Sequence, residues 1–198
     1  MGYVVQGEWD QHYTDGKGFR PLGDVERAVL AEHAPAPKGG GRALDVGCGV
    51  GDLAVHLGGQ GYAVDAVDFA ASAIARAESE HVDVKGVRWL RLDIERDDPE
   101  ELHSTGYDLI TLRLVLPFLR DRARVMHGLG GRLRPGGALV IITPTAEHTP
   151  EDRRDIALDE EEIRLLRADW KETERLTVDE LAVLVLRGPC PNGTSAVR

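Results

Sequence analysis

Ala43-Leu44-Asp45-Val46-Gly47-Cys48-Gly49-Val50-Gly51-Asp52 is the stretch that decides the fold. It is a short apolar run with one acid near its end, and it breaks into three alternating glycines. Gly47, Gly49 and Gly51 remove the Cβ atoms from the turn, so the backbone can adopt positive φ and a ligand can contact the main chain directly. The stretch therefore predicts a strand that turns sharply into a helix around a bound cofactor.

The glycine spacing and the position of Asp45 discriminate between classes of cofactor. A dinucleotide fingerprint places its third glycine three positions after the second, where this chain has Asp52, and Gly51 comes one residue early. Asp45 stands two residues before the first glycine, where its charge would repel a phosphate and attract an ammonium or sulfonium group. The pattern favours a cationic ligand over a pyrophosphate.

Length and composition limit the class of protein. With 198 residues, of which 42% are hydrophobic, the chain has the size of one domain with a full core. A formal charge of −10 without a basic stripe argues against a nucleic-acid partner. Residues 1–10 do not resemble a signal peptide, and no apolar span reaches about 18 residues, so we expect a cytoplasmic protein without a membrane partner. Cys48 and Cys190 are predicted to be free thiols.

Strand-like and helix-like segments alternate after the glycine stretch, which predicts an α/β fold with a mostly parallel sheet and an antiparallel end. Strands are expected at 42–46, 62–67, 87–92, 107–114 and 138–143, followed by a hairpin of 172–178 and 181–187. Helices are expected at 24–33, 52–59, 72–81, 120–133 and 160–170. Ser72 is the predicted N-cap of its helix, and residues 134–137 are predicted to form a turn.

The chain is expected to divide into three parts. Residues 1–41 combine an N-terminal segment that contains one helix with a linker rich in proline and glycine, and this segment is a candidate lid. Residues 42–188 are expected to form the cofactor-binding core. Residues 189–198 are predicted to be a disordered tail.

The D-x-G-x-G-x-G pattern of residues 45–51 closely resembles motif I of the class I S-adenosylmethionine-dependent methyltransferases. Leu133-Arg134-Pro135-Gly136-Gly137 resembles the loop before their fifth strand, and the resemblance spans residues 42–187. It implies a Rossmann-like, doubly wound, mostly parallel sheet of seven strands with a C-terminal antiparallel hairpin. It also implies S-adenosylmethionine as the cofactor.

Acids that directly follow strands are the expected cofactor ligands, because doubly wound sheets bind ligands at the carboxyl ends of their strands. The resemblance implies that Asp68 accepts hydrogen bonds from both ribose hydroxyls and that Asp93 accepts one from the adenine amine. Taken alone, either acid is equally well interpreted as a helix N-cap. The implied cofactor contacts are Trp9, Tyr13, Asp45, Gly47, Cys48, Gly49, Gly51, Asp68, Phe69, Asp93, Ile94 and Arg113.

Two of these assignments have structural alternatives. Residues 9–13 resemble the short W-D-x-x-Y segment with which several small-molecule methyltransferases close over their cofactor, but Trp9 and Tyr13 would equally serve to dock the segment onto the core. Arg113 either takes part in the active site, lining it or orienting an anionic substrate, or has no role there. Leu116 and Phe118 are predicted to be packing residues rather than substrate contacts.

Methyl transfer from a sulfonium is an in-line displacement that depends mainly on geometry, and a general base is needed only when the nucleophile is protonated. His148 follows the fifth strand and His12 lies in the candidate lid, so these two are the candidate bases. The alternative for each is an ordinary surface imidazole. No metal site is predicted.

The sequence thus favours an S-adenosylmethionine-dependent methyltransferase that acts on an oxygen or nitrogen atom of a small molecule, as a monomer or homodimer. One alternative is a non-catalytic S-adenosylmethionine-binding regulatory or accessory protein. Another is an enzyme that uses the bound sulfonium only as a positive charge. A nicotinamide dehydrogenase is disfavoured by Asp52, which stands where its third glycine belongs.

Overall fold

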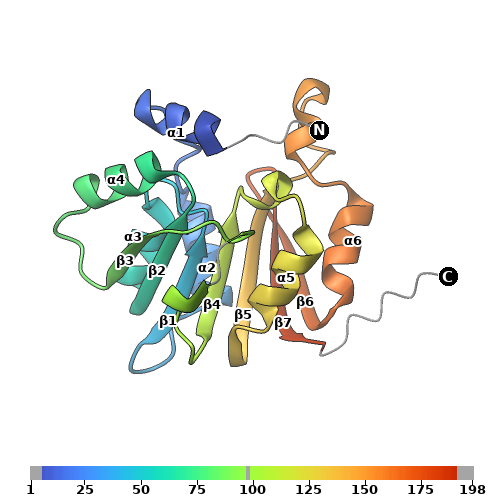
Figure 1. The fold of residues 1–198 in the computed structure, drawn as a ribbon. Helices are drawn as coiled ribbons and strands as arrows, with labels where there is room; N and C mark the ends of the chain where they lie inside the picture. The colour runs from blue at the N-terminus through green and yellow to red at the C-terminus, as the bar shows by residue number, and fades with distance from the viewer. Residues whose placement is uncertain (1–5, 97–98, 191–198) are drawn as a thin grey trace.

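A computed structural model describes residues 6–96 and 99–190, which contain one seven-stranded sheet (Figure 1). The strand order is β3-β2-β1-β4-β5-β7-β6, and β7 runs antiparallel to both of its neighbours while the other pairs are parallel. The strands are β1 Gly41–Val46, β2 Tyr62–Asp68, β3 Val87–Arg91, β4 Tyr107–Arg113, β5 Leu133–Pro144, β6 Trp170–Val178 and β7 Leu181–Pro189. The predicted seven-stranded, mostly parallel sheet with a terminal hairpin is confirmed.

Helices cover both faces of this sheet. They are α1 Gln6–Thr14, α2 Asp24–His33, α3 Asp52–Gly59, α4 Ala71–Glu80, α5 Arg122–Gly130 and α6 Glu160–Ala168, with short 3-10 turns η1 Pro99–Glu101, η2 Leu116–Phe118 and η3 Glu151–Ile156. Side chains alternate along a strand, so Leu109 of β4 packs with α2 and α3 while its neighbour Ile110 packs with α5 and α6. β4 is therefore buried on both faces, as expected of a central parallel strand.

The N-terminal part contains two helices, α1 and α2, where the sequence predicts one. The helix predicted to begin at Ser72 begins at Ala71, and its N-cap is Ala70. The Ser72 hydroxyl instead donates a hydrogen bond to the Asp10 carbonyl at 2.9 Å, which attaches α1 to α4. A contact with a distant part of the chain thus takes the side chain that local sequence assigns to a cap.

The predicted turn at residues 134–137 is wrong, because these residues lie inside β5. The register of β4 against β5 shifts between Tyr107 and Leu109, and Gly136 adopts a φ of +80° there. A Cβ atom on Gly137 would lie 2.9 Å from the Tyr107 carbonyl oxygen. The two glycines therefore let the strand bulge and continue rather than end. Residues 191–198 of the predicted tail lie outside the described residues, and Pro189 still belongs to β7.

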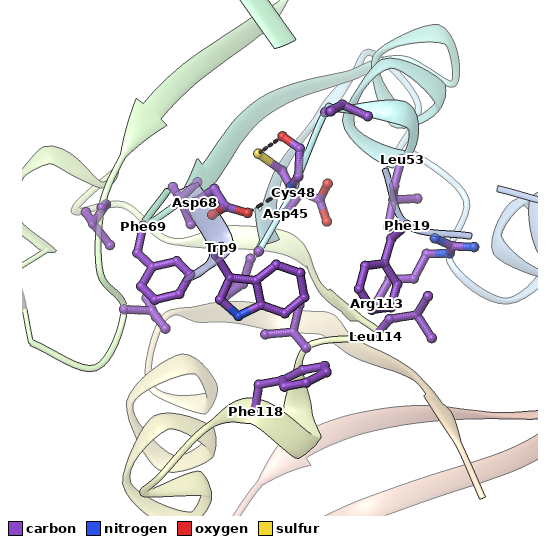
Figure 2. A pocket seen from close by; sticks show the side chains of 18 of the residues that line it. Trp9, Phe19, Asp45, Cys48, Leu53, Asp68, Phe69, Arg113, Leu114 and Phe118 are labelled. Atoms are coloured by element: carbon purple, nitrogen blue, oxygen red, sulfur yellow. Dashed lines mark hydrogen bonds between the residues drawn. The ribbon is translucent and has the colours of Figure 1, made fainter. Parts of the chain in front are cut away.

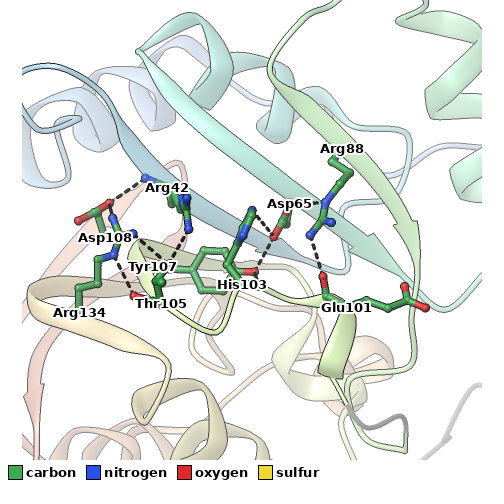
Figure 3. A network of polar contacts seen from close by, with 9 residues as sticks. All are labelled: Arg42, Asp65, Arg88, Glu101, His103, Thr105, Tyr107, Asp108 and Arg134. Atoms are coloured by element: carbon green, nitrogen blue, oxygen red, sulfur yellow. Dashed lines mark hydrogen bonds and ion pairs between the residues drawn. The ribbon is translucent and has the colours of Figure 1, made fainter.

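A buried carboxylate, Asp65 of β2, joins the sheet to η1 (Figure 3). Its oxygens accept a hydrogen bond of 2.6 Å from the Tyr107 hydroxyl and one of 2.8 Å from Arg88 Nε, and His103 Nε2 lies 3.7 Å away. Arg88 also donates to the Glu101 carbonyl of η1. The charge of Asp65 is thus compensated within the fold, which indicates a structural role.

Tyr107→Phe is expected to destabilise the protein by about 1 to 3 kcal/mol, because it removes a donor from a buried carboxylate. Equilibrium denaturation in urea measures the change. In the Asp65→Asn background the same substitution should cost clearly less, since the hydrogen bond to a charge is already gone. Equal costs in both backgrounds would contradict this account of the network.

Candidate active site

The glycine loop between β1 and α3 has the conformation that its sequence predicts. Gly47, Gly49 and Gly51 all adopt positive φ. A Cβ atom on Gly47 would lie 2.3 Å from Val115, and one on Gly51 would lie 2.4 Å from the Trp89 ring. Larger residues would therefore both strain the backbone and clash with neighbouring elements.

This loop forms one wall of a pocket at the carboxyl ends of β1, β2 and β4 (Figure 2). Every predicted cofactor residue except Gly51 lines this pocket, so residues from α1, the glycine loop and the ends of β2, β3 and β4 meet at one place. Gly51 lies at the base of the loop, directly before α3. The remaining wall, which sequence reasoning did not assign to the site, includes Phe19, Arg20, Leu53, Leu114 and Phe118.

Asp45 places a carboxylate deep in the pocket wall, where its side chain is 1% exposed. Its Oδ1 atom accepts a hydrogen bond of 2.7 Å from the Thr111 hydroxyl, whereas Oδ2 is buried and has no partner among the described residues. Burial raises the pKa of Asp45 to about 7, while the Thr111 hydrogen bond and the charge of Arg113 act in the opposite direction. An unpartnered buried oxygen of this kind is suited to receive a cationic hydrogen-bond donor.

Asp68, at the end of β2, connects the glycine loop to the start of α4. Its Oδ2 atom accepts from the Gly49 amide and its Oδ1 atom from the Ala70 amide, both at 2.9 Å. Burial raises the pKa of Asp68, and backbone hydrogen bonds from Ala70, Gly49 and Phe69 partly counteract the effect. Asp68 also lines the pocket, where its remaining acceptor capacity is available to a ligand.

Asp93 and Ile94 follow β3 at the other end of the pocket, near Phe69. Asp93 Oδ1 accepts a hydrogen bond of 3.0 Å from the Glu95 amide and so caps a turn. No helix directly follows Asp93 in the described part of the chain, so this acid caps a turn rather than a helix and also lies in the pocket wall. The Phe69 carbonyl accepts a hydrogen bond of 2.8 Å from Gln6, which fixes the start of α1 beside the pocket.

Arg113 lines the pocket, but its guanidinium is committed to the N-terminal part of the chain. It forms a bidentate pair with Glu26 of α2, with Nε–Oε2 at 2.6 Å and Nη2–Oε1 at 3.0 Å. It also donates to the carbonyls of Arg20 and Pro21. Arg113 therefore attaches residues 20–26 to the end of β4, and its donors are not free to bind an anionic substrate.

Aromatic side chains from three elements close the pocket, in what we call the aromatic roof: Trp9 of α1, Phe19, and Phe118 of η2. The Trp9 ring centroid lies 5.5 Å from that of Phe19 and 5.3 Å from that of Phe118. In Figure 2 the indole lies between Phe69 and Phe19. Phe118 was predicted to pack, and it both packs in the roof and lines the pocket, whereas Leu116 is fully buried in the core.

The structure brings neither candidate base into the pocket wall. His148 is exposed, and its Nδ1 atom lies 2.9 Å from the Thr145 hydroxyl. The ring of His12 packs against Trp9, Tyr13 and Phe19, and its Nε2 atom is buried without a partner among the described residues.

A doubly wound sheet in this order, with a glycine loop after β1 and acids at the ends of β1, β2 and β3, defines a Rossmann-like cofactor-binding protein. Comparison with known proteins shows that residues 44–139, just under half of the chain, match the model described as a methyltransferase domain. Together with methyltransferase relatives, this match supports a class I S-adenosylmethionine-dependent methyltransferase.

Two relatives show the extent of the sequence similarity. An uncharacterized methyltransferase of Mycobacterium bovis is 36% identical over 110 residues, which are 56% of this chain and 54% of the relative. A ubiquinone biosynthesis O-methyltransferase of Acinetobacter baumannii is 27% identical over 139 residues, or 68% of this chain and 56% of the relative. The chain thus spans about half the length of the curated relatives it matches.

Solved structures share the fold over nearly the whole chain. A SAM-dependent methyltransferase from Aquifex aeolicus superposes with a TM-score of 0.70 at 19% identity, covering 92% of this chain and 97% of that one. The N-methyltransferase NodS from Bradyrhizobium japonicum gives a TM-score of 0.63 at 23% identity, covering 90% and 95%.

Proposed function

We propose that this protein binds S-adenosylmethionine and moves its methyl group by in-line displacement to an oxygen or nitrogen atom of a small-molecule acceptor. The observation that carries the proposal is the buried, unpartnered Oδ2 atom of Asp45, which lies beside a glycine loop and in one pocket with Asp68. A phosphate would be repelled at Asp45, whereas the ammonium group of a methionine moiety would supply the missing donor.

The other residues of the wall fit the rest of this cofactor. Asp68 would accept hydrogen bonds from the ribose hydroxyls with its remaining acceptor capacity. Phe69 and Ile94 offer apolar surface to the adenine ring, and Asp93 would accept a hydrogen bond from its amine. Trp9 and Tyr13 would cover the cofactor from α1. These roles agree with those that the family resemblance implies.

S-adenosylmethionine supplies an activated methyl group on a sulfonium, so the task of the chain is to hold and enclose the reactants. Alignment of the reacting atoms can contribute about 7 to 11 kcal/mol. The aromatic roof excludes water, which strengthens the electrostatic interactions inside the pocket. Because the roof crosses the pocket, the space left for an acceptor suits a small molecule better than a polymer.

The charge and the helices of the chain agree with a small-molecule acceptor. The formal charge of −10 argues against nucleic acid as a partner. Within residues 6–96 and 99–190, no helix is long and apolar enough to cross a bilayer. We infer a cytoplasmic protein that acts as a monomer or homodimer, and light scattering would distinguish these two states.

Calorimetric titration with S-adenosylmethionine and S-adenosylhomocysteine tests the proposal. Asp68→Ala is expected to weaken both ligands by at least about tenfold, because hydrogen bonds to a charged group are lost. Asp83→Ala, at an exposed position outside the pocket, is the control and should bind like the wild type. NAD should not bind. Failure of both sulfur nucleotides to bind the wild-type protein would refute the proposal, and binding without turnover of any acceptor would favour the non-catalytic alternative.

A further inference from the structure

The acceptor end of the pocket is the part below the aromatic roof and beside the loop that follows β4. Trp9, Phe19 and Phe118 meet there with Leu114 and Leu119. The rings of Trp9 and Phe118 stand nearly perpendicular, with an interplanar angle of 88°. Such a wall presents both faces and edges of aromatic rings, which suits a flat apolar group and also attracts a cation.

Both cationic side chains in the pocket wall are already paired. Arg113 is held by Glu26 and by two carbonyl groups, as described above. Arg20 donates from Nη1 to the Asp179 carbonyl at 3.2 Å, and its Nη2 atom lies 3.6 Å from the Asp179 carboxylate. Both guanidinium groups are therefore engaged with protein groups. An acceptor with a carboxylate, a phosphate or a thiolate would therefore find no free cation there.

The remaining charges of the wall are acidic, namely those of Asp45, Asp52, Asp68, Asp93 and Glu95. Glu95 is partly engaged, because one of its oxygens accepts from the amides of Arg120 and Asp121 at 2.9 Å. The bound cofactor would compensate some of this negative charge, but the sum still favours a cation and disfavours an anion. The acidic charges and the aromatic surface thus both favour a cationic acceptor.

Within the described ranges, the pocket wall contains no histidine or lysine that would deprotonate a hydroxyl group. The phenol of Tyr13 is no substitute, since burial raises its pKa. An alcohol would need such a base in the transition state. An amine needs none in the transfer step, because the small fraction that is free base at neutral pH, after loss of a proton to solvent, already carries a lone pair.

We infer that the acceptor is an amine carried on a flat, apolar group, a conclusion that rests on the proposed function and names its substrate class. The acid-rich wall attracts the amine as its ammonium ion, and the amine reacts as its free base after it has exchanged a proton with bulk solvent at the open pocket. Its lone pair then forms the new N–CH3 bond while the CH3–S bond breaks and its electron pair passes to sulfur. The positive charge moves from the sulfonium to the methylated ammonium, which later loses its own proton to solvent.

Binding of matched probes to the full chain, saturated with S-adenosylhomocysteine, tests the inference. The probes are 2-phenylethylamine, 2-phenylethanol, 2-phenylethanethiol and 3-phenylpropionate, which share a ring and differ in the reacting group. We expect 2-phenylethylamine to bind at least about tenfold more tightly than each of the other three probes. A fifth probe, 2-methoxyethylamine, has the same charge but no ring and should bind more weakly than 2-phenylethylamine. With S-adenosylmethionine, methyl transfer to 2-phenylethylamine, detected by mass spectrometry, would add support.

Equal or tighter binding of the alcohol, thiol or carboxylate overturns the inference while leaving the proposed function intact, because S-adenosylhomocysteine is bound throughout. Absence of S-adenosylhomocysteine binding overturns both, and the first titration reveals it. Phe118→Ala should weaken the amine by about tenfold, a clearly larger factor than its effect on S-adenosylhomocysteine affinity, and Phe118→Tyr should retain most of the amine affinity. An unaltered amine affinity in Phe118→Ala would also overturn the assignment of this wall.

Discussion

Asp45→Asn is expected to stabilise the ligand-free protein at pH 8 by roughly 2 to 4 kcal/mol. The same substitution should weaken S-adenosylmethionine binding by at least about tenfold, because the ammonium group loses its charged partner. Asp45 is thus expected to reduce stability in return for cofactor affinity, which is a common property of binding sites. The opposite signs of the two effects make the prediction specific.

The sign of the stability effect follows from the raised pKa of Asp45. Burial raises this pKa to about 7 in the folded chain, compared with about 3.9 for an unfolded aspartate. Between these values the folded state binds more protons than the unfolded state, so ionisation of Asp45 lowers stability as the pH rises. The destabilisation is absent below the unfolded pKa and complete above the folded one. Asparagine removes the cost because it carries no charge.

Urea unfolding of wild type and Asp45→Asn at pH 8 and pH 5 measures the effect. The gain should be largest at pH 8 and clearly smaller at pH 5, where the wild-type carboxyl is already protonated in the folded chain. Asp83→Asn, at an exposed site, should show no such pH dependence. A destabilised Asp45→Asn variant at pH 8 would show that its carboxylate is better compensated than the unpartnered Oδ2 atom implies.

Cofactor binding should have a matching pH dependence. The ammonium group favours the ionised form of Asp45, so affinity for S-adenosylmethionine should fall as the pH drops below about 7. The charges that act on Asp45 in the structure are those of Arg113 and Asp68, in opposite directions. In Asp45→Asn this part of the pH dependence should vanish, and calorimetry between pH 6 and pH 8 provides the comparison.

The features that sequence predicted well depend on local chemistry. Alternating glycines specify a turn with positive φ, and an acid at the end of a parallel strand reaches the same edge of the sheet as the next one. Eleven of the twelve predicted cofactor residues therefore line one pocket, Gly51 being the exception. The seven-strand order required the family resemblance, because periodicity indicates strands but does not order them.

The features that sequence missed depend on contacts between distant residues. Glu26 reads as an ordinary acid in the first turn of an amphipathic helix, yet it pairs with Arg113, 87 positions away. Ser72 reads as a helix cap, yet Asp10 takes its hydroxyl. Phe19 lies in the aromatic roof next to residues 20 and 21, whose carbonyl groups are attached to Arg113. No local pattern encodes these pairings.

The ion pair of Glu26 and Arg113 is the basis of the second large effect. The side chain of Glu26 is fully buried and that of Arg113 is 10% exposed. Glu26→Gln removes one charge and leaves the other buried without its counterion, and such changes cost about 3 to 5 kcal/mol. Since Arg113 also holds the carbonyls of residues 20 and 21, the segment that carries Phe19 should loosen as well.

Urea unfolding measures the loss of stability in Glu26→Gln, and limited trypsin digestion at Lys17 reports on the loosened segment.

The double variant Glu26→Leu/Arg113→Met should recover much of the stability, because it removes both desolvation costs together. It should still show a raised KM for the acceptor, since a methionine side chain has no donors for the two carbonyls. Glu161→Gln, which breaks the exposed pair with Arg164, is the control and should change stability far less. If Glu26→Gln lost as little stability as Glu161→Gln, water would reach the Glu26–Arg113 pair, and α1 alone would hold the aromatic roof.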